Sequence, residues 1–200
     1  MNNVTFRDFE ERDIDFIYRC KNDENLNRMI VGEFHPFSYE DARKWVLGCM
    51  GEHDSFKFWA ICANDKEQRI VGWVALSKID RVNQSACTHS IVIADPDYND
   101  GMAWIETEFH LLEYTFEVLK LNRLYGVSLM GHKMSNQIGE LLFFKTEGIL
   151  RQACFKNNRF YDLQYIGILK DEYFTHKEAG DYEIMSVIRR LRKLRKKTND

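Results

Sequence analysis

The feature that most constrains the fold is a strand-like apolar run that passes through a polar turn directly into a long helix. Residues 87–94 are typical of a buried strand, and the run ends at Asp95-Pro96. Residues 97–101 form the turn, and residues 102–119 carry apolar side chains at helical spacing. A helix that begins this abruptly has unpaired N–H groups and a partial positive charge, which suit a phosphate group. On its own, the same pattern is also that of an ordinary turn.

The remaining hydrophobic pattern predicts early helices, an antiparallel meander, a second strand-helix unit and a closing hairpin. We expect further strands at residues 4–9, 56–63, 70–79, 124–130, 149–156 and 159–169. We expect further helices near residues 14–20, 38–49, 136–144 and 182–197. Ser38, followed by acidic residues, is typical of a helix N-cap. Together these elements predict an α+β fold, with one mixed, mostly antiparallel central sheet flanked by helices and a basic C-terminal helix.

The composition fits a single globular domain. The chain has 200 residues, of which 44% are apolar, so it can bury a core without disulfide or metal support. Its five cysteines contain no C-x-x-C pair, which favours reduced thiols over a zinc or disulfide framework. We find no apolar run near the roughly 20 residues of a membrane span and no signal-peptide pattern. We therefore expect a cytoplasmic protein that does not associate with membranes.

The net charge of −3 hides an uneven distribution. Residues 189–197 carry seven of the 28 basic residues, which leaves residues 1–188 with 21 basic and 30 acidic ones. An acidic body repels nucleic acid and attracts cationic substrates. We therefore divide the chain into a domain over residues 1–176 and a basic amphipathic tail over residues 177–200.

The tail is expected to be a solvated terminal helix that packs through an apolar stripe. The stripe consists of Ile184, Val187, Ile188, Leu191 and Leu194. Docking on an acidic partner, on a second copy of the chain in a homodimer, or on anionic lipid stays open as an alternative.

Several short segments, taken in order, resemble a known family. They are residues 58–61 (FWAI), 70–76 (IVGWVAL), 93–98 (IADPDY), 106–116, 121–125 (LNRLY), 135–151 and 157–162 (NNRFYD). From Phe6 to about Tyr173 the chain resembles the GNAT superfamily of N-acetyltransferases. Within that superfamily it is most similar to the branch of RimJ/RimL-type ribosomal-protein, spermidine and amino-sugar acetyltransferases.

The resemblance implies acetyl-CoA as the acetyl donor and no metal. Backbone amides of the central strand at Ile91, Val92 and Ile93 would hold the pantetheine arm and polarise the thioester carbonyl, as an oxyanion hole does. The other positions implied in coenzyme binding are Tyr98, Asn99, Asp100, Gly101, Met102, Ala103, Trp104, His132 and Ser135.

The chain departs from the family pattern at the coenzyme loop and at one catalytic position. The family loop usually has a basic or glutamine lead residue and two glycines, whereas this loop has neither lead residue and only Gly101. Asp100 would place a negative charge near the pyrophosphate. The tyrosine that often serves as general acid in the family falls on Gly139.

Direct transfer to an amine needs a base for the ammonium and an acid or dipole for the thiolate. His89 is the first candidate base because it lies where relatives often carry a glutamate, and a histidine pKa suits neutral pH. A half-buried structural histidine is the alternative. His132 is a second candidate, through water or the coenzyme, and Tyr161 or Tyr165 could replace the missing tyrosine. Asp95 and Asp97 could bind a cationic amine.

We therefore predict an acetyl-CoA-dependent N-acetyltransferase that acts by direct transfer to the primary amine of a small molecule, such as a polyamine or an amino sugar. A peptide or protein N-terminal amine is an alternative acceptor. A catalytically silent GNAT-like module that binds a coenzyme or a partner is the alternative from another class, and the weakened loop and Gly139 favour it.

Overall fold

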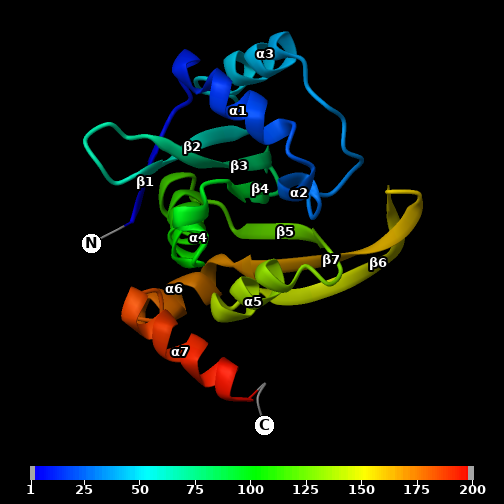
Figure 1. The fold of residues 1–200 in the computed structure, drawn as a ribbon. Helices are drawn as coiled ribbons and strands as arrows, with labels where there is room; N and C mark the ends of the chain where they lie inside the picture. Colours follow the sequence, from blue (N-terminus) through cyan, green and yellow to red (C-terminus); the bar gives the residue numbers. More distant parts are fainter. Residues whose placement is uncertain (1–2, 198–200) are drawn as a thin grey trace.

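The computed structural model describes residues 3–197, apart from the side chains of His89 and of residues 194–197. In this part of the chain a seven-stranded sheet has the order β1-β2-β3-β4-β5-β7-β6 (Figure 1). The strands are β1 (Val4–Arg7), β2 (Lys57–Ala63), β3 (Ile70–Asp80), β4 (Ser85–Ile93), β5 (Arg123–Leu129), β6 (Lys145–Lys156) and β7 (Arg159–Leu169). Neighbouring strands are antiparallel except β4 and β5, which are parallel. The predicted α+β fold is confirmed.

Helices lie on both sides of this sheet. They are α1 (Ile14–Lys21), α2 (Glu24–Asn27), α3 (Tyr39–Cys49), α4 (Met102–Glu113), α5 (Lys133–Leu141), α6 (Lys170–Glu178) and α7 (Ile184–Lys197). Helices α1 and α3 cover one face of the sheet. Helix α4 lies on the opposite face, with α6 and α7 beyond it (Figure 1). In the described chain, no helix combines the length and the apolar character that a membrane crossing requires.

The sheet separates two hydrophobic cores because successive side chains of a strand point to opposite faces. On β2, Ala60 and Cys62 join the core beneath α1 and α3, whereas Trp59 and Ile61 join the core around α4. Both faces of the central strands are therefore apolar, as the continuous apolar runs of the sequence indicate.

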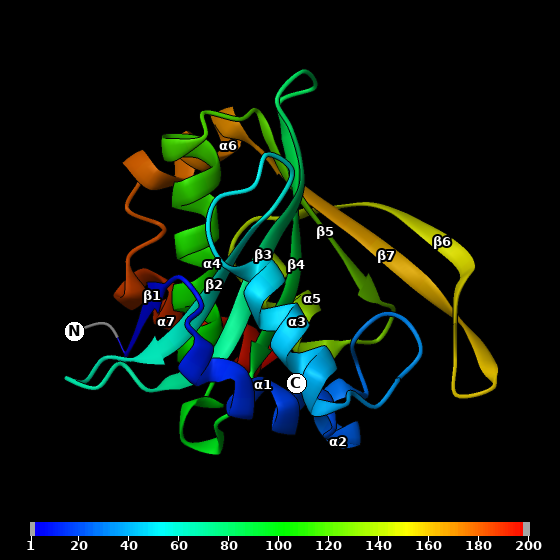
Figure 2. The ribbon, with the colours of Figure 1, turned by 90° about the horizontal axis from the view of Figure 1, so that it is seen from above.

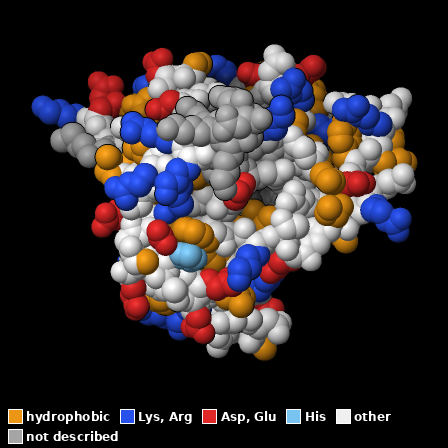
Figure 3. All heavy atoms as spheres, turned by 90° about the horizontal axis from the view of Figure 1, so that it is seen from below, with side chains coloured by type: hydrophobic (Ala, Val, Ile, Leu, Met, Phe, Trp, Pro, Cys, Tyr) orange, Lys and Arg blue, Asp and Glu red, His pale blue; other side chains and the backbone are white. Residues whose placement is uncertain are grey.

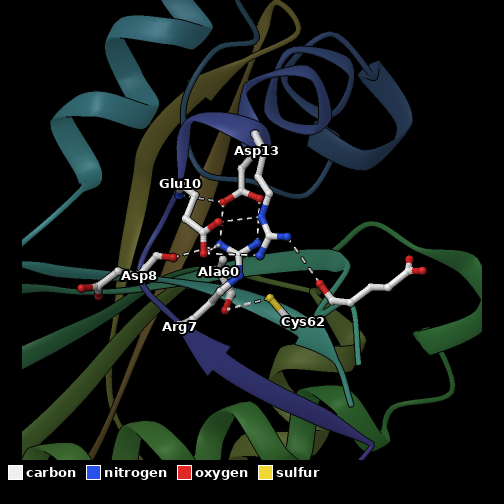
Figure 4. A network of polar contacts seen from close by, with 8 residues as sticks. Arg7, Asp8, Glu10, Asp13, Ala60 and Cys62 are labelled. Carbon is white, nitrogen blue, oxygen red and sulfur yellow. Dashed lines mark hydrogen bonds and ion pairs between the residues drawn. The ribbon is translucent and has the colours of Figure 1, made fainter. Parts of the chain in front are cut away.

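Two local networks fix the N-terminal helices. Ser38 accepts a hydrogen bond from the Asp41 N–H at 3.1 Å and the Asp41 carboxylate accepts from the Ser38 N–H at 3.0 Å, so the predicted N-cap is confirmed as a capping box. Arg7 of β1 contacts both oxygens of the buried Asp13 at 2.8 Å (Figure 4). This hydrogen-bonded pair raises the pKa of the Arg7 guanidinium and ties the start of α1 to the edge strand.

Two helices differ from the predicted pattern because they lack an amphipathic stripe. The four-residue α2 begins where the Asp23 carboxylate accepts from the N–H groups of Asn25 and Leu26. In α6, Tyr173 is the buried residue, so hydrophobic spacing gave no helical signal there. The predicted helix over 102–119 is α4, which continues as a π-helix over Tyr114–Val118.

The described part of the C-terminal tail packs on the domain. Val187 is buried in the core around α4, and the Arg190 guanidinium donates to the Leu141 carbonyl at 3.2 Å and to the Asp181 carboxylate at 3.1 Å. The face below the sheet carries Lys and Arg interspersed with Asp and Glu (Figure 3). The predicted boundary between residues 176 and 177 falls inside α6, and the division of the chain there stays a prediction.

At the centre of the sheet, β3 and β4 approach each other closely. Gly72 pairs with Ile93, and a Cβ added to Gly72 would lie 2.1 Å from the Val92 carbonyl oxygen. Glycine is therefore required here, because a larger residue would push β4 away from β3.

We expect Gly72→Ala to lower the free energy of unfolding by about 1–3 kcal/mol, as overpacking of a tight core does. Gly48→Ala is the matched control, because a Cβ at Gly48 meets nothing within 4 Å and lies in helix α3. The control should be stabilised by about 0.5–1 kcal/mol. Denaturant unfolding measures both, and equal stabilities for the two variants would contradict the close approach of β4.

Candidate functional site

The sheet opens between its two parallel strands. The pairing of β4 with β5 covers residues Ser85 to Thr88 against Arg123 to Gly126. Beyond this point β4 continues to Ile93 along β3, while β5 continues to Leu129 along β7. The two strands diverge (Figure 2), so among the described strands the edge of β4 that faces β5 has no ladder partner after Thr88.

A β-bulge lies on β4 at this opening. His89 pairs with Ala75 and Val92 with Trp73, so Ser90 and Ile91 together face the single residue Val74. Ser90 has a φ of 53°, the left-handed conformation found in one class of bulge. A bulge bends its strand and redirects backbone groups, and this one does so where β4 leaves β5.

The opening forms a cleft of about 470 Å³. Its walls come from the loop between α2 and α3, from β3 and the bulged part of β4, from α4 and the start of α5, and from β5 and β7. This volume is in the range of small-molecule sites, which are concave and mostly apolar with a few polar groups. In the described chain we find no group of three or more His, Cys, Asp or Glu side chains that could hold a metal.

Glu108 is the residue in this cleft that sequence reasoning missed. It projects from α4 into the lining, and its Oε2 is buried without a hydrogen-bond partner among the described residues. Burial raises the pKa of this carboxyl to about 7. A carboxylate oxygen that is buried without a hydrogen-bond partner destabilises the fold, and such a group is typical of a place where a ligand or a proton binds.

A weak signal for Glu108 was present in the sequence. Trp104 also lines the cleft and lies four residues earlier, on the same face of α4. This face is next to the apolar stripe that contains Ile105 and Phe109, so Glu108 is an acidic residue beside a buried stripe. The hydrophobic pattern of the sequence did not indicate that β4 and β5 diverge next to Glu108.

Two of the predicted coenzyme residues, His132 and Ser135, meet at the start of α5 and line the cleft. The Ser135 N–H donates to His132 Nδ1 at 3.2 Å, so the proton of the neutral imidazole is on Nε2. Burial lowers the pKa of His132, which keeps the ring neutral near pH 7. The rings of His132 and Trp104 lie 6.3 Å apart.

The predicted phosphate turn, residues 97–101, lies outside the cleft lining, and of the predicted coenzyme residues 98–104 it is Trp104 that lines the cleft. Gly101, with a φ of 93°, is the N-cap of α4, and the Met102 N–H donates to the Asp100 carboxylate at 2.8 Å. Tyr98 is half-buried, Asn99 and Asp100 are exposed, and Ala103 is buried. The first amide of the helix is therefore occupied by a carboxylate of the chain itself.

The predicted residues of β4 divide between the cleft and the core. Ile91 lines the cleft, whereas Val92 and Ile93 are buried side chains of the two cores. The side chain of His89 is outside the described structure. Its backbone lies directly before the bulge, and its catalytic role stays a prediction.

Of the two candidate tyrosines, Tyr165 lines the cleft, while Tyr161 is farther along β7. The Tyr161 hydroxyl accepts from Arg159, and its ring lies against Leu129, Cys154 and Leu163. Its role as a general acid stays a prediction.

Asp95, Asp97 and Gly139 are the remaining positions that the sequence analysis singled out. Asp95 pairs with Arg69, which lowers the pKa of its carboxyl, and Asp97 donates its N–H to Asp95 at 3.0 Å. At Gly139, an added Cβ would lie 3.1 Å from Ile166 Cδ1, so packing fills the position of the family tyrosine.

Comparison with known proteins agrees with this architecture. The acetyltransferase (GNAT) domain family matches residues 3–144. The SPbeta prophage-derived uncharacterized N-acetyltransferase YokL of Bacillus subtilis (strain 168) is 28% identical over 171 residues, which are 86% of this chain and 92% of the relative.

Solved structures with the same fold include the following two. Spermidine N-acetyltransferase from Vibrio cholerae, in complex with CoA and spermine, has a TM-score of 0.76 at 23% identity, over 86% of this chain and 98% of that one. A GCN5-related N-acetyltransferase from Brucella melitensis has a TM-score of 0.74 at 22% identity, over 90% and 81% of the two chains. The family match runs from β1 through α5 and includes the divergence of β4 and β5. The chain therefore belongs to the GNAT family of acetyltransferases.

Proposed function

We propose that this protein transfers the acetyl group of acetyl-CoA directly to the primary amine of a small molecule. The observation that carries the proposal is Glu108 Oε2, which is buried without a hydrogen-bond partner among the described residues, in the cleft where β4 leaves β5. A family member needs a group that accepts the proton of the attacking ammonium, and a carboxyl with a pKa near 7 suits that task at neutral pH.

The arm of the donor fits the residues along β4. Among the described strands, the edge of β4 that pairs with β5 has no ladder partner after Thr88, and the bulge residues Ser90 and Ile91 line the same opening. When bound, acetyl-CoA would supply an activated thioester carbonyl. Backbone N–H groups at the bulge would polarise that carbonyl, in the manner of an oxyanion hole.

The phosphate end fits less well. Helix α4 offers a partial positive charge at its N-terminus, but the Asp100 carboxylate already accepts the Met102 N–H. Asp100 is exposed, so its side chain can rotate away at little cost. Coenzyme binding would have to displace it, and the like charges would still weaken the complex.

The chain's own residues supply the remaining chemistry. Glu108 would bind the ammonium of the acceptor and take its proton before attack. Tyr165 lines the same cleft and offers a phenol O–H for the departing sulfur. Neutral His132 presents Nε2–H as a further donor, with its orientation set by the Ser135 N–H.

We expect Glu108→Gln to lower kcat by about 10²–10⁴-fold, the range of general-base catalysis. In the wild type, kcat/KM should rise with pH through about 7, because burial raises the pKa of Glu108 to that value and the ionised form is the base. Steady-state rates between pH 5.5 and 9 measure this. A pH profile that Glu108→Gln leaves unchanged would remove the base assignment.

The pH dependence of folding stability also tests the raised pKa of the Glu108 carboxyl. Its folded pKa is above the ordinary value of 4.5, so the folded state binds this proton more tightly. The stability of the wild type relative to Glu108→Gln should be highest below pH 4.5 and should fall as the pH rises through about 7. Melting temperatures of both proteins across this range measure the difference, and parallel curves would show that Glu108 is not desolvated.

We expect Asp100→Asn to tighten coenzyme A binding, because it removes a negative charge beside the phosphate turn. An exposed charge pair is worth about 1 kcal/mol or less, so the expected gain is roughly three- to fivefold and should shrink at high salt. Calorimetric titration with coenzyme A measures it. Asp97→Asn, in the same turn, is the control, since Asp97 is exposed and does not bond to the start of α4. Equal or weaker binding by Asp100→Asn would place the phosphates elsewhere.

A further inference from the structure

We infer that the acceptor is a monoamine, with one positive charge attached to an aliphatic or aromatic body, and not a polyamine. This inference rests on the proposed acetyl transfer and names the class of amine that the cleft would select. Three features carry it: the charged side chains of the cleft lining, the apolar wall formed by the loop between α2 and α3, and the attachment that holds this wall in place.

The described residues of the cleft lining include one carboxylate that could pair with an ammonium group. Among the described residues that line it, the charged side chains are Glu108 and Lys78. Lys78 is exposed at the rim, on β3. A polyamine brings several ammonium groups, and each one that leaves water needs a carboxylate or several carbonyl groups to replace its hydration. Glu108 can pair with one of them, and Lys78 would repel the next.

The rest of the cleft suits an apolar body. Met29, Ile30 and Val31 of the loop between α2 and α3 form one wall, and Leu163 and Ile166 of β7 lie on another. Each CH₂ group of an acceptor that is buried here would favour binding, whereas the hydroxyl groups of a sugar would lose hydrogen bonds to water. Part of the 470 Å³ must also hold the donor arm, which leaves room for a small body only.

A buried lysine fixes the apolar wall. Lys156, at the end of β6, is 3% exposed, and its ammonium donates to the carbonyl oxygens of Asn27, Ile30 and Gly32 at 3.0, 2.8 and 2.9 Å. These three bonds join the β6–β7 hairpin to the loop whose residues line the cleft. Hydrogen bonds from a charged donor are stronger than those between neutral groups, so the loop is held in its cleft-lining position before a ligand binds.

Lys156 is therefore a positioning residue for the acceptor. It does not line the cleft itself, and its effect would be transmitted through Ile30 and its neighbours. Loss of its ammonium would leave three carbonyl groups without their donor and would loosen the wall. Among the described residues, the ammonium of Lys156 bonds to the loop between α2 and α3 and not to the donor side along β4 and the start of α4. Acceptor binding should therefore suffer more than coenzyme binding.

The first experiment compares isoamylamine and phenethylamine with spermidine, glucosamine and a short peptide that has an apolar first residue. Coenzyme A release gives kcat/KM, and calorimetry on protein saturated with coenzyme A gives amine affinity without turnover. We expect the monoamines to exceed spermidine and glucosamine by at least about tenfold in both measurements. Tighter binding and faster turnover of spermidine, or of the peptide, would overturn the inference.

Failure of the proposed function has a different signature. In that case no amine would release coenzyme A, while the calorimetric ranking of the amines would still support or overturn the monoamine class.

Lys78→Glu gives an independent test, because it adds a carboxylate at the rim. We expect this variant to improve spermidine relative to phenethylamine by several-fold, and an unchanged ratio would count against the charge argument.

The second experiment tests the wall. Lys156→Met should raise the KM for phenethylamine at least about fivefold, with the Kd of coenzyme A unchanged within about twofold. Lys145→Met is the matched control, since Lys145 lies on the same strand, is exposed and pairs with Glu172. If Lys156→Met lowers coenzyme affinity and amine affinity equally, or lowers neither, Lys156 does not position the acceptor wall. The melting temperatures of the wild type and both variants are measured as well, so that KM and Kd are compared only below the temperature at which each protein unfolds.

Discussion

The end of the β4–β5 ladder at Thr88 and Gly126 is the constraint on which the site depends. A continuous parallel pair would satisfy the backbone of both strands and leave no opening in the sheet. The bulge at Ser90 prevents this, because it changes the direction of β4 while Gly72 lets β4 stay close to β3 on its other side. The cleft therefore forms because the two strands diverge. Glu108 has a raised pKa because it is buried at this cleft.

Two acidic residues on α4 show how the same residue type takes opposite roles. Glu106 is buried and accepts hydrogen bonds from the N–H groups of Asn3, at 2.9 and 3.1 Å, and Val4, at 3.0 Å. It fixes the start of the edge strand, and its hydrogen-bond capacity is used within the fold. Glu108 has no such partner for its Oε2. Satisfied polar groups stabilise a structure, whereas an unsatisfied one in a cleft is available to a ligand.

The sequence predicted the elements that have a strong local pattern. The strand, turn and helix over residues 87–119 and the closing hairpin follow from apolar spacing and from glycine and asparagine in turns. The bulge did not follow, because a serine at φ 53° has no signature in an apolar run. Neither did the contacts of Lys156, whose carbonyl partners lie 124 to 129 residues away. Sites of this kind depend on non-local contacts, which periodicity does not encode.

The donor and acceptor sides of the site differ in how much of their structure is fixed in advance. On the donor side, outside the cleft lining, the exposed Asp100 carboxylate accepts the first N–H of the helix that a phosphate would use, so binding there requires a side chain to move. At the acceptor end, Lys156 holds the apolar wall through three hydrogen bonds within the chain. Preformed walls lower the entropy cost of binding and reject ligands that do not fit them. Selectivity should therefore reside on the acceptor side, where the structure has the least freedom to adapt.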